Sequence, residues 1–281
     1  MTTGRLPNFI YIGTNKAGST WLYDVLARHP DVYMAPGKGL YFFSKHYERG
    51  LDWYRRHFEE VGDERIVGEV SHSYMYSDDV WKRIAEMDPE IRLMVCLREP
   101  VDRAFADYLD GVKNGLIHGD FETELEREPP FLQRSHYSRY LAPYVEQFGL
   151  DSIHVAVFDE LSADPSAYAK KIFAFLGIEE LDLAPAQREK MMPAGTPRSR
   201  LVAGLAKKAS HTARALGLRG LRGRVKRSRT VRNALYRQFK SDEKPRMLLE
   251  TRARLRERFD EEVTHLDDLL RTSLRRTWGY D

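Results

Sequence analysis

A short apolar run, FIYIG (residues 9–13), leads directly into the loop GTNKAGSTW (residues 13–21). The run contains aromatic and β-branched residues and closes with glycine, which indicates a buried strand. The segment after the loop, STWLYDVLARHP, has apolar residues at helical spacing: Trp21, Leu22, Val25 and Leu26. The predicted helix ends at Pro30. The start of the chain therefore predicts a strand, a glycine-containing turn and a helix.

The alternation of strand and helix patterns continues along the chain. Runs of the strand type are RIVGEV (65–70), IRLMVCL (91–97) and IHVAVF (153–158). Segments with helical spacing are SDDVWKRIAEM (77–87, with Ser77 as the expected cap), PVDRAFADYLDGV (100–112), SRYLAPYVEQFG and DPSAYAKKIFAFLG. This order predicts an α/β fold of three layers, with helices on both faces of a mainly parallel central sheet. Ligands of such folds bind at the carboxyl ends of the strands.

We interpret residues 1–281 as one domain that carries a helical basic lid at about 185–245 and a C-terminal helix at 245–281 packed on the core. Between Pro197 and Ser241 the chain has many Lys and Arg residues and no Asp or Glu. This charge fits a flap over a polyanionic ligand, a nucleic-acid patch, a membrane-surface contact or a solvated face. The scarcity of aromatic residues argues against nucleic acid. The C-terminal helix has one apolar face: Leu255, Phe259, Val263, Leu266 and Leu270.

Composition narrows the class of protein. Hydrophobic residues make up 42% of the chain and charged residues 31%, as in ordinary globular proteins. No apolar stretch approaches the roughly 20 residues that span a bilayer, and the N-terminus enters a strand pattern without a leader, so we expect a cytoplasmic protein. The single cysteine, Cys96, excludes an internal disulfide and is expected to be an inert core residue. The histidines lack ligand spacing, so no metal site is expected.

The loop resembles a nucleotide-triphosphate loop but departs from it. Gly13 and Gly18 have the spacing of G-x-x-x-x-G-K-[ST], yet position 19 is serine and the lysine is Lys16, inside the loop. Backbone N–H groups at the helix start would still form an anion cradle. A P-loop kinase or nucleotide triphosphatase is therefore disfavoured. A tight turn with a surface lysine remains the structural alternative.

The segment KAGSTW resembles the 5′-phosphosulfate loop of sulfotransferases that use 3′-phosphoadenosine 5′-phosphosulfate (PAPS). Further segments resemble that family in the same order: LPNFIYIG, HPDVYMAPGKGLYFFS, GEVSHSYM, LREPVDRAFADY, FDELSADPSAYAKKIFAFLGI and PRSRL. The similarity covers most of the chain and is weakest from about 205 to 245. It implies a PAPS-dependent sulfotransferase that needs no metal.

The resemblance also implies which residues hold PAPS. Lys16 and the N–H groups that follow it would bind the 5′-phosphosulfate: Ala17, Gly18, Ser19 and Thr20. Trp21 would stack near the adenine, or else be a core aromatic residue. Arg98 begins the 3′-phosphate site, since its planar fork matches phosphate. The family's serine eight residues later is Ala106 here, and Arg198, Arg200 or another cation of the lid is the expected replacement.

A general base must accept the proton of the acceptor. Similar relatives read Lys-Glu-Pro-His-Phe-Phe after the first loop, whereas this chain reads Lys38-Gly39-Leu40-Tyr41-Phe42-Phe43, so the usual glutamate is absent. His72, just beyond the next strand, resembles the catalytic histidine of cytosolic sulfotransferases and is the expected base. Glu69 is the alternative base or an orienting group. Lys38 is expected to face the sulfuryl oxygens.

The expected acceptor is a small hydroxylated, possibly phenolic, metabolite. Aromatic residues near the strand ends are candidates to line its pocket or belong to the core: Tyr41, Phe43, Tyr74, Tyr76, Phe105 and Tyr108. The alternative to an enzyme is a relative that binds PAPS without turnover, which the substitutions at Gly39 and Ala106 favour. The oligomeric state is not predicted.

Overall fold

A five-stranded parallel sheet forms the centre of the molecule in the computed structural model, which describes residues 4–188, 195–197, 236–238 and 245–281. The strand order is β2-β3-β1-β4-β5, and every neighbouring pair is parallel. The strands are β1 (Phe9–Gly13), β2 (Val32–Met34), β3 (Ile66–Val70), β4 (Arg92–Leu97) and β5 (Ile153–Val157). Strand β1 lies between β3 and β4, so the carboxyl ends of these three strands meet at one edge of the sheet.

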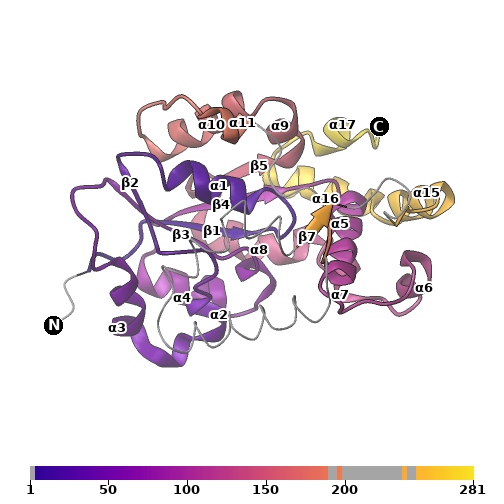
Figure 1. Cartoon of the computed structure of the whole chain (residues 1–281), viewed down its shortest axis with the longest axis horizontal. Helices are drawn as coiled ribbons and strands as arrows, with labels where there is room; N and C mark the ends of the chain where they lie inside the picture. The colour runs from indigo at the N-terminus through magenta and orange to yellow at the C-terminus, as the bar shows by residue number, and fades with distance from the viewer. Residues whose placement is uncertain (1–3, 189–194, 198–235, 239–244) are drawn as a thin grey trace.

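Helices cover both faces of the sheet, which confirms the expected three-layer α/β fold (Figure 1). On one face lie α1 (Ser19–Leu26), α9 (Phe158–Ala163), α10 (Pro165–Leu176) and α11 (Pro185–Arg188). On the other lie α4 (Val80–Met87), α5 (Pro100–Lys113), α8 (Tyr137–Phe148) and α16 (Asp260–Leu270). Side chains alternate along a strand: Phe9 and Tyr11 pack toward α1, and Ile10 and Ile12 toward α8.

Short elements join these layers. They are α2 (Phe42–Lys45), α3 (Gly50–Arg55), α6 (Phe121–Leu125), α7 (Pro130–Gln133), and the 3₁₀ turns η1 (Tyr47–Arg49), η2 (Arg56–Phe58), η3 (Tyr74–Tyr76) and η4 (Leu150–Ser152). Strands β6 (Gly195–Pro197) and β7 (Tyr236–Gln238) form a separate antiparallel pair. This pair lies within the segment predicted to be a helical lid without strands. The rest of that segment that falls within 189–194, 198–235 and 239–244 lies outside the described residues.

Strand β2 and the start of helix α4 differ from the sequence prediction. Strand β2 was not predicted, because three residues are too few to show a period of two. Helix α4 begins at Val80 with Asp79 at its N-cap, not at Ser77, since residues 74–76 just before form a 3₁₀ turn.

The C-terminal segment forms three helices instead of one: α15 (Leu249–Arg258), α16 and α17 (Leu274–Trp278). The break falls at Phe259, whose φ of −92° and ψ of 3° are not helical. The bend lets α15 pack on α5 and α16 on α8. The five apolar residues predicted to share a face are all buried, at 5% exposure or less.

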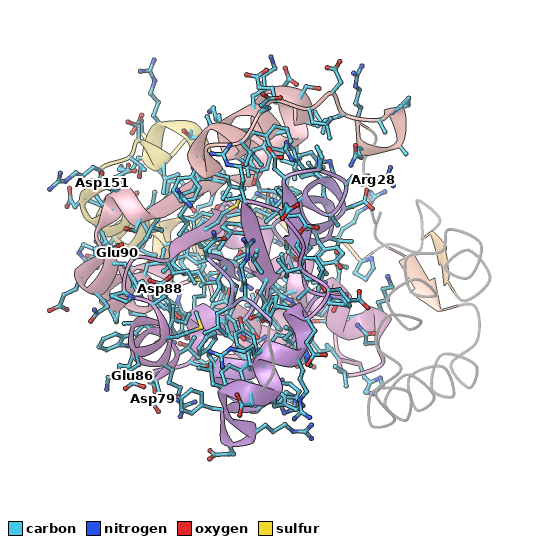
Figure 2. All side chains as sticks on the ribbon, turned by 90° about the vertical axis from the view of Figure 1, so that its left-hand side faces the viewer. Arg28, Asp79, Glu86, Asp88, Glu90 and Asp151 are labelled. Carbon is cyan, nitrogen blue, oxygen red and sulfur yellow. The ribbon has the colours of Figure 1, made fainter. Side chains whose placement is uncertain are left out.

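Acidic residues lie at the amino ends of two strands. Asp88 and Glu90 lie in the turn before β4, and Asp151 lies just before β5, so all three mark the amino ends of strands. Figure 2 labels all three on the same side of the molecule, the left-hand side of that view. The cations of the predicted site follow the carboxyl ends of β1 and β4, at the opposite edge. Within the described ranges, no helix has both the length and the apolar character needed to cross a membrane.

Candidate active site

The turn between β1 and α1 leads into a helix start at Gly18. Gly18 is the N-cap of α1 with φ of 81°, and no side chain caps the helix. A Cβ at this position would lie 2.6 Å from the Leu161 side chain, so position 18 requires glycine for both its backbone angle and its space. Uncapped N–H groups and the positive end of the helix dipole favour an anion. The sequence prediction of an anion cradle thus has a structural basis.

Lys38 reaches this helix start from the segment after β2. Its Nζ donates hydrogen bonds to Thr20 Oγ1 at 2.6 Å and to Ser19 Oγ at 3.1 Å. Because the ammonium occupies a lone pair of each hydroxyl, both hydroxyl protons stay free to donate to an anion. The structure therefore brings Lys38, Ser19 and Thr20 together, although Lys38 is 18 residues away from Thr20 in sequence.

Lys16 pairs with a carboxylate that the sequence analysis did not single out. Lys16 Nζ lies 2.6 Å from Asp110 Oδ1 on α5, and both side chains are partly exposed. Asp110 lies one helical turn beyond Ala106, the position of the missing serine. Because residues four apart in a helix lie on one face, Asp110 and Ala106 share a face of α5. This spacing could have been recognised in the sequence once the helix at 100–112 was predicted.

Arg98 follows β4, the strand beside β1, as its position in the sequence predicts. Its guanidinium donates to the backbone oxygen of Lys16 at 3.3 Å and lies 4.8 Å from the ring centre of Phe158. Two cations, Lys16 and Arg98, therefore stand at neighbouring strand ends. Arg198 and Arg200, the proposed replacements for the serine, lie outside the described residues.

A buried network fixes the loop to α5, and sequence reasoning missed it. Arg103 is 0% exposed and donates to Asn15 Oδ1 at 3.0 Å, to Asp107 Oδ2 at 3.2 Å and to Ser135 Oγ at 2.9 Å. Asn15 Nδ2 donates back to Asp107 at 2.8 Å. Burial opposes ionisation of Asp107, but the charge of Arg103 and the hydrogen bond from Asn15 outweigh it and lower the pKa of that carboxyl. The loop is thus held by a satisfied ionic network.

His72 lies in the turn after β3 and is mostly buried. The Tyr41 hydroxyl oxygen is 3.2 Å from each of its ring nitrogens. Burial, followed by the charges of Lys38, Lys16 and Lys45, lowers the pKa of His72 to about 3, against the opposing effect of Asp107. The imidazole is therefore neutral at neutral pH and keeps a lone pair for a proton.

Glu69 lies within β3 and is 1% exposed. It accepts hydrogen bonds from three hydroxyls: Tyr54 at 2.5 Å, Tyr74 at 2.9 Å, and Ser71. Burial raises the pKa of its carboxyl, although the three hydroxyl bonds act in the opposite direction. Both of its oxygens are occupied by the protein, which favours an orienting group over a base.

Several other predicted residues belong to the core. Trp21 is 4% exposed, donates from Nε1 to the Gln187 oxygen at 2.7 Å and packs edge-on against Tyr168. These contacts favour the core interpretation of Trp21, because α10 and α11 pack on this side of α1. Burial raises the pKa of Cys96 to about 12, as expected of an inert thiol. Three of the candidate pocket aromatics are also buried: Phe43, Tyr74 and Tyr108.

Among the described residues, no group of three or more His, Cys, Asp or Glu side chains is arranged to hold a metal ion.

Taken together, a parallel α/β sheet, an uncapped helix start after β1 and cations on two neighbouring strand ends define a P-loop-like transferase fold. The family model described as the sulfotransferase domain matches residues 6–194, more than half of the chain. The chain belongs to the sulfotransferase family, as its motifs predict.

Similar curated proteins carry a more specific name. Heparan sulfate glucosamine 3-O-sulfotransferase 3A1 of Mus musculus is 29% identical over 186 residues, which cover 63% of this chain and 47% of the relative. Heparan sulfate glucosamine 3-O-sulfotransferase 5 of Homo sapiens is 28% identical over 188 residues, covering 62% and 54%. The chain thus spans about half the length of these relatives. A sulfotransferase from Alicyclobacillus acidocaldarius shares the fold, with a TM-score of 0.70 and 23% identity over 96% of this chain and 97% of that one.

Proposed function

We propose that the protein transfers the sulfuryl group of PAPS to a hydroxyl group, with His72 as the general base. The observation that carries this proposal is the convergence of Lys38, Ser19 and Thr20 at the uncapped start of α1, beside a neutral His72. A kinase would place a lysine directly after Gly18, whereas here both lysines approach from other positions. A cytoplasmic location, a single-domain organisation and independence of metal stay predictions from the sequence.

The residues present fit the two anionic ends of PAPS. The helix start with Lys16, Lys38 and the hydroxyls of Ser19 and Thr20 would hold the 5′-phosphosulfate, and Arg98 would hold the 3′-phosphate. PAPS, when bound, supplies an activated sulfuryl group on a phosphate leaving group. Lys16 would have to leave Asp110 to reach the leaving oxygen. There it would stabilise the charge that builds as the bond to sulfur breaks.

The role of His72 in the proposed reaction is to take up the proton of the acceptor hydroxyl. The acceptor oxygen forms a new bond to sulfur, the bond from sulfur to the bridging oxygen breaks, and its electron pair stays on the 5′-phosphate. The acceptor proton passes to the free ring nitrogen of His72. The low pKa of His72 arises from burial and from nearby lysine charges, and the negative charges of the donor offset the lysine part. Donor binding therefore makes His72 a stronger base.

The acceptor is the least defined part of the proposal. We propose a small hydroxylated metabolite, and a phenol fits the partly exposed aromatic rings of Tyr41, Tyr76 and Phe105. A second candidate is a sugar hydroxyl, because curated relatives are named for glucosamine in heparan sulfate. The ring centres of Tyr76 and Tyr140 lie 5.1 Å apart, and the Arg134 guanidinium lies 5.7 Å from the ring centre of Tyr76. Two aromatic rings beside a cation would suit an anionic sugar.

The test measures binding and transfer separately. Calorimetry with adenosine 3′,5′-bisphosphate should show binding that weakens in Lys16→Ala and persists in His72→Ala. Transfer of labelled sulfate from PAPS to a panel of phenols and glucosamine oligosaccharides should fall by about 10²–10⁴ in His72→Ala. Lys171→Ala is the matched control, because Lys171 pairs with Glu160 on the surface, at 2.8 Å.

Three outcomes contradict the proposal. Absence of bisphosphate binding by the wild type removes the donor assignment. Stronger binding of ATP with Mg²⁺ favours a kinase. Tight bisphosphate binding without transfer to any acceptor favours a relative that has lost turnover.

A further inference from the structure

Tyr41 and His72 form a specific pair across two segments. The Tyr41 hydroxyl oxygen lies at hydrogen-bond distance, 3.2 Å, from both imidazole nitrogens. The rings meet edge to face, with centroids 5.7 Å apart and planes at 74°. The two residues are 31 positions apart in sequence, so only the packing of the segment after β2 against the turn after β3 brings them together.

The backbone of Tyr41 is held in an uncommon conformation. Its φ is 51°, in the left-handed region that bulky residues seldom adopt. The Tyr41 N–H donates to Ser71 Oγ at 3.1 Å, and the Ser71 hydroxyl donates to the buried Glu69. The Lys45 ammonium lies 4.9 Å from the centre of the Tyr41 ring. A chain of contacts therefore runs from Glu69 through Ser71 and Tyr41 to His72.

Gly39 leaves the space that the Tyr41 ring occupies. A Cβ at position 39 would lie 2.7 Å from Cε2, 3.0 Å from Cζ and 3.2 Å from the hydroxyl oxygen of Tyr41. The first of these distances is too short for a carbon–carbon contact, so any side chain at this position would push the ring away from His72. Gly39 also has φ of 76°, which disfavours other residues.

We propose that Tyr41 is the positioning residue for His72, and that Gly39 is required because it leaves room for the Tyr41 ring. The Tyr41 hydroxyl oxygen lies equally close to both imidazole nitrogens, so it holds the ring in place without selecting which nitrogen carries the proton. The nitrogen that carries no hydrogen keeps the lone pair that receives the acceptor proton. This inference rests on the proposed function, in which His72 is the base. In this proposal Gly39 supports catalysis by making room for Tyr41. From the sequence alone, this glycine instead favours a relative without turnover.

The first experiment does not depend on turnover. The full-length protein with nitrogen-15-labelled histidine is compared by NMR with Tyr41→Phe, and the His72 signals are assigned by their loss in His72→Gln. The wild type should show one sharp set of His72 signals at neutral pH, and Tyr41→Phe should shift or broaden them because the ring loses its contact with the hydroxyl. Tyr47→Phe is the matched control, because the Tyr47 hydroxyl bonds to Glu86, at 3.1 Å, and not to His72. Unchanged His72 signals in Tyr41→Phe overturn the inference.

The second experiment uses sulfate transfer and a double-mutant cycle. Tyr41→Phe should lower kcat about tenfold, the rate equivalent of one lost hydrogen bond, with the KM for PAPS unchanged. The same change in a His72→Gln background should cost nothing further. Gly39→Ala should lower kcat by a similar factor without adding to Tyr41→Ala, while thermal unfolding confirms that the variants fold. Additive losses overturn the inference.

The two proposals fail in different ways. If the wild type transfers no sulfate but Tyr41→Phe shifts or broadens the His72 signals, the enzymatic proposal fails and the positioning contact stands. If transfer occurs and His72→Gln abolishes it while Tyr41→Phe changes neither NMR signals nor kcat, the function stands and the role of Tyr41 is wrong.

Discussion

Glu69 provides a decisive test of the site, because two roles for it predict opposite results. As the base, its carboxylate must face the acceptor. As an orienting group, it must stay inside the network of Tyr54, Tyr74 and Ser71 that the structure shows. Glu69→Gln changes the side chain least in shape and removes its ability to take up a proton, so stability and turnover can be compared directly.

The expected loss of stability follows from the three hydrogen bonds. The carboxyl oxygen Oε1 accepts two of them and Oε2 accepts the third, from Tyr54 at 2.5 Å. The glutamine oxygen can keep the pair at Oε1, but its amide nitrogen then meets the Tyr54 hydroxyl at a distance shorter than N–H···O bonds prefer. One net hydrogen bond and some strain amount to about 1–2 kcal/mol of unfolding free energy. Tyr54→Phe, which removes only one hydroxyl of this network, should cost about 1 kcal/mol.

The pH dependence of this loss has a definite sign. Burial raises the folded-state pKa of Glu69 above its ordinary value of 4.5. The stability that this shift contributes is fully present below about pH 4.5 and is lost as the pH rises through the folded-state pKa. The wild type should therefore gain stability relative to Glu69→Gln as the pH falls toward that value.

The assay combines urea unfolding, bisphosphate calorimetry and sulfate transfer on Glu69→Gln and Tyr54→Phe. We expect both variants to lose stability, to bind the bisphosphate normally and to retain turnover within about tenfold. If Glu69→Gln is as stable as the wild type but loses a hundredfold or more in kcat, Glu69 is the base and the reasoning is refuted.

Three further predictions address the anion site and its base. Ala106→Ser should restore a hydroxyl on the face of α5 that carries Asp110 and tighten bisphosphate binding by about tenfold, as expected for a hydrogen bond to a charged group; unchanged affinity by calorimetry would place the 3′-phosphate elsewhere. Asp110→Asn should release Lys16 and tighten binding about threefold at low salt, the scale of an exposed ion pair, and weaker binding would contradict a competing role for Asp110. Burial lowers the pKa of His72 from 6.5 to about 3, so the unfolded chain takes up this proton first as the pH falls. The folded protein should therefore lose stability as the pH falls through that window. Urea unfolding of His72→Gln should show a smaller loss, and identical profiles would show that His72 is not buried as described.

Local patterns in the sequence determined the framework. The run FIYIG, the glycine turn and the apolar spacing of residues 21–26 are sufficient for a strand, loop and helix, because each depends on neighbours in the chain. Parallel crossovers then place the carboxyl ends of β1 and β4 at one edge. Lys16 and Arg98 follow those ends, so their proximity was predictable. Strand β2 was not, since three residues show no period.

Only the tertiary structure decided which side chains meet. Trp21 has the same local sequence whether it stacks on a ligand or packs on Tyr168, and the packing of α10 against α1 favours the core. The hydroxyls around Glu69 and the pairing of Tyr41 with His72 join segments far apart in the chain. Such contacts depend on how separate elements pack, which no local period records. The chain's own pattern thus predicts an anion site after β1 and β4, whereas only packing decides that Tyr41 meets His72.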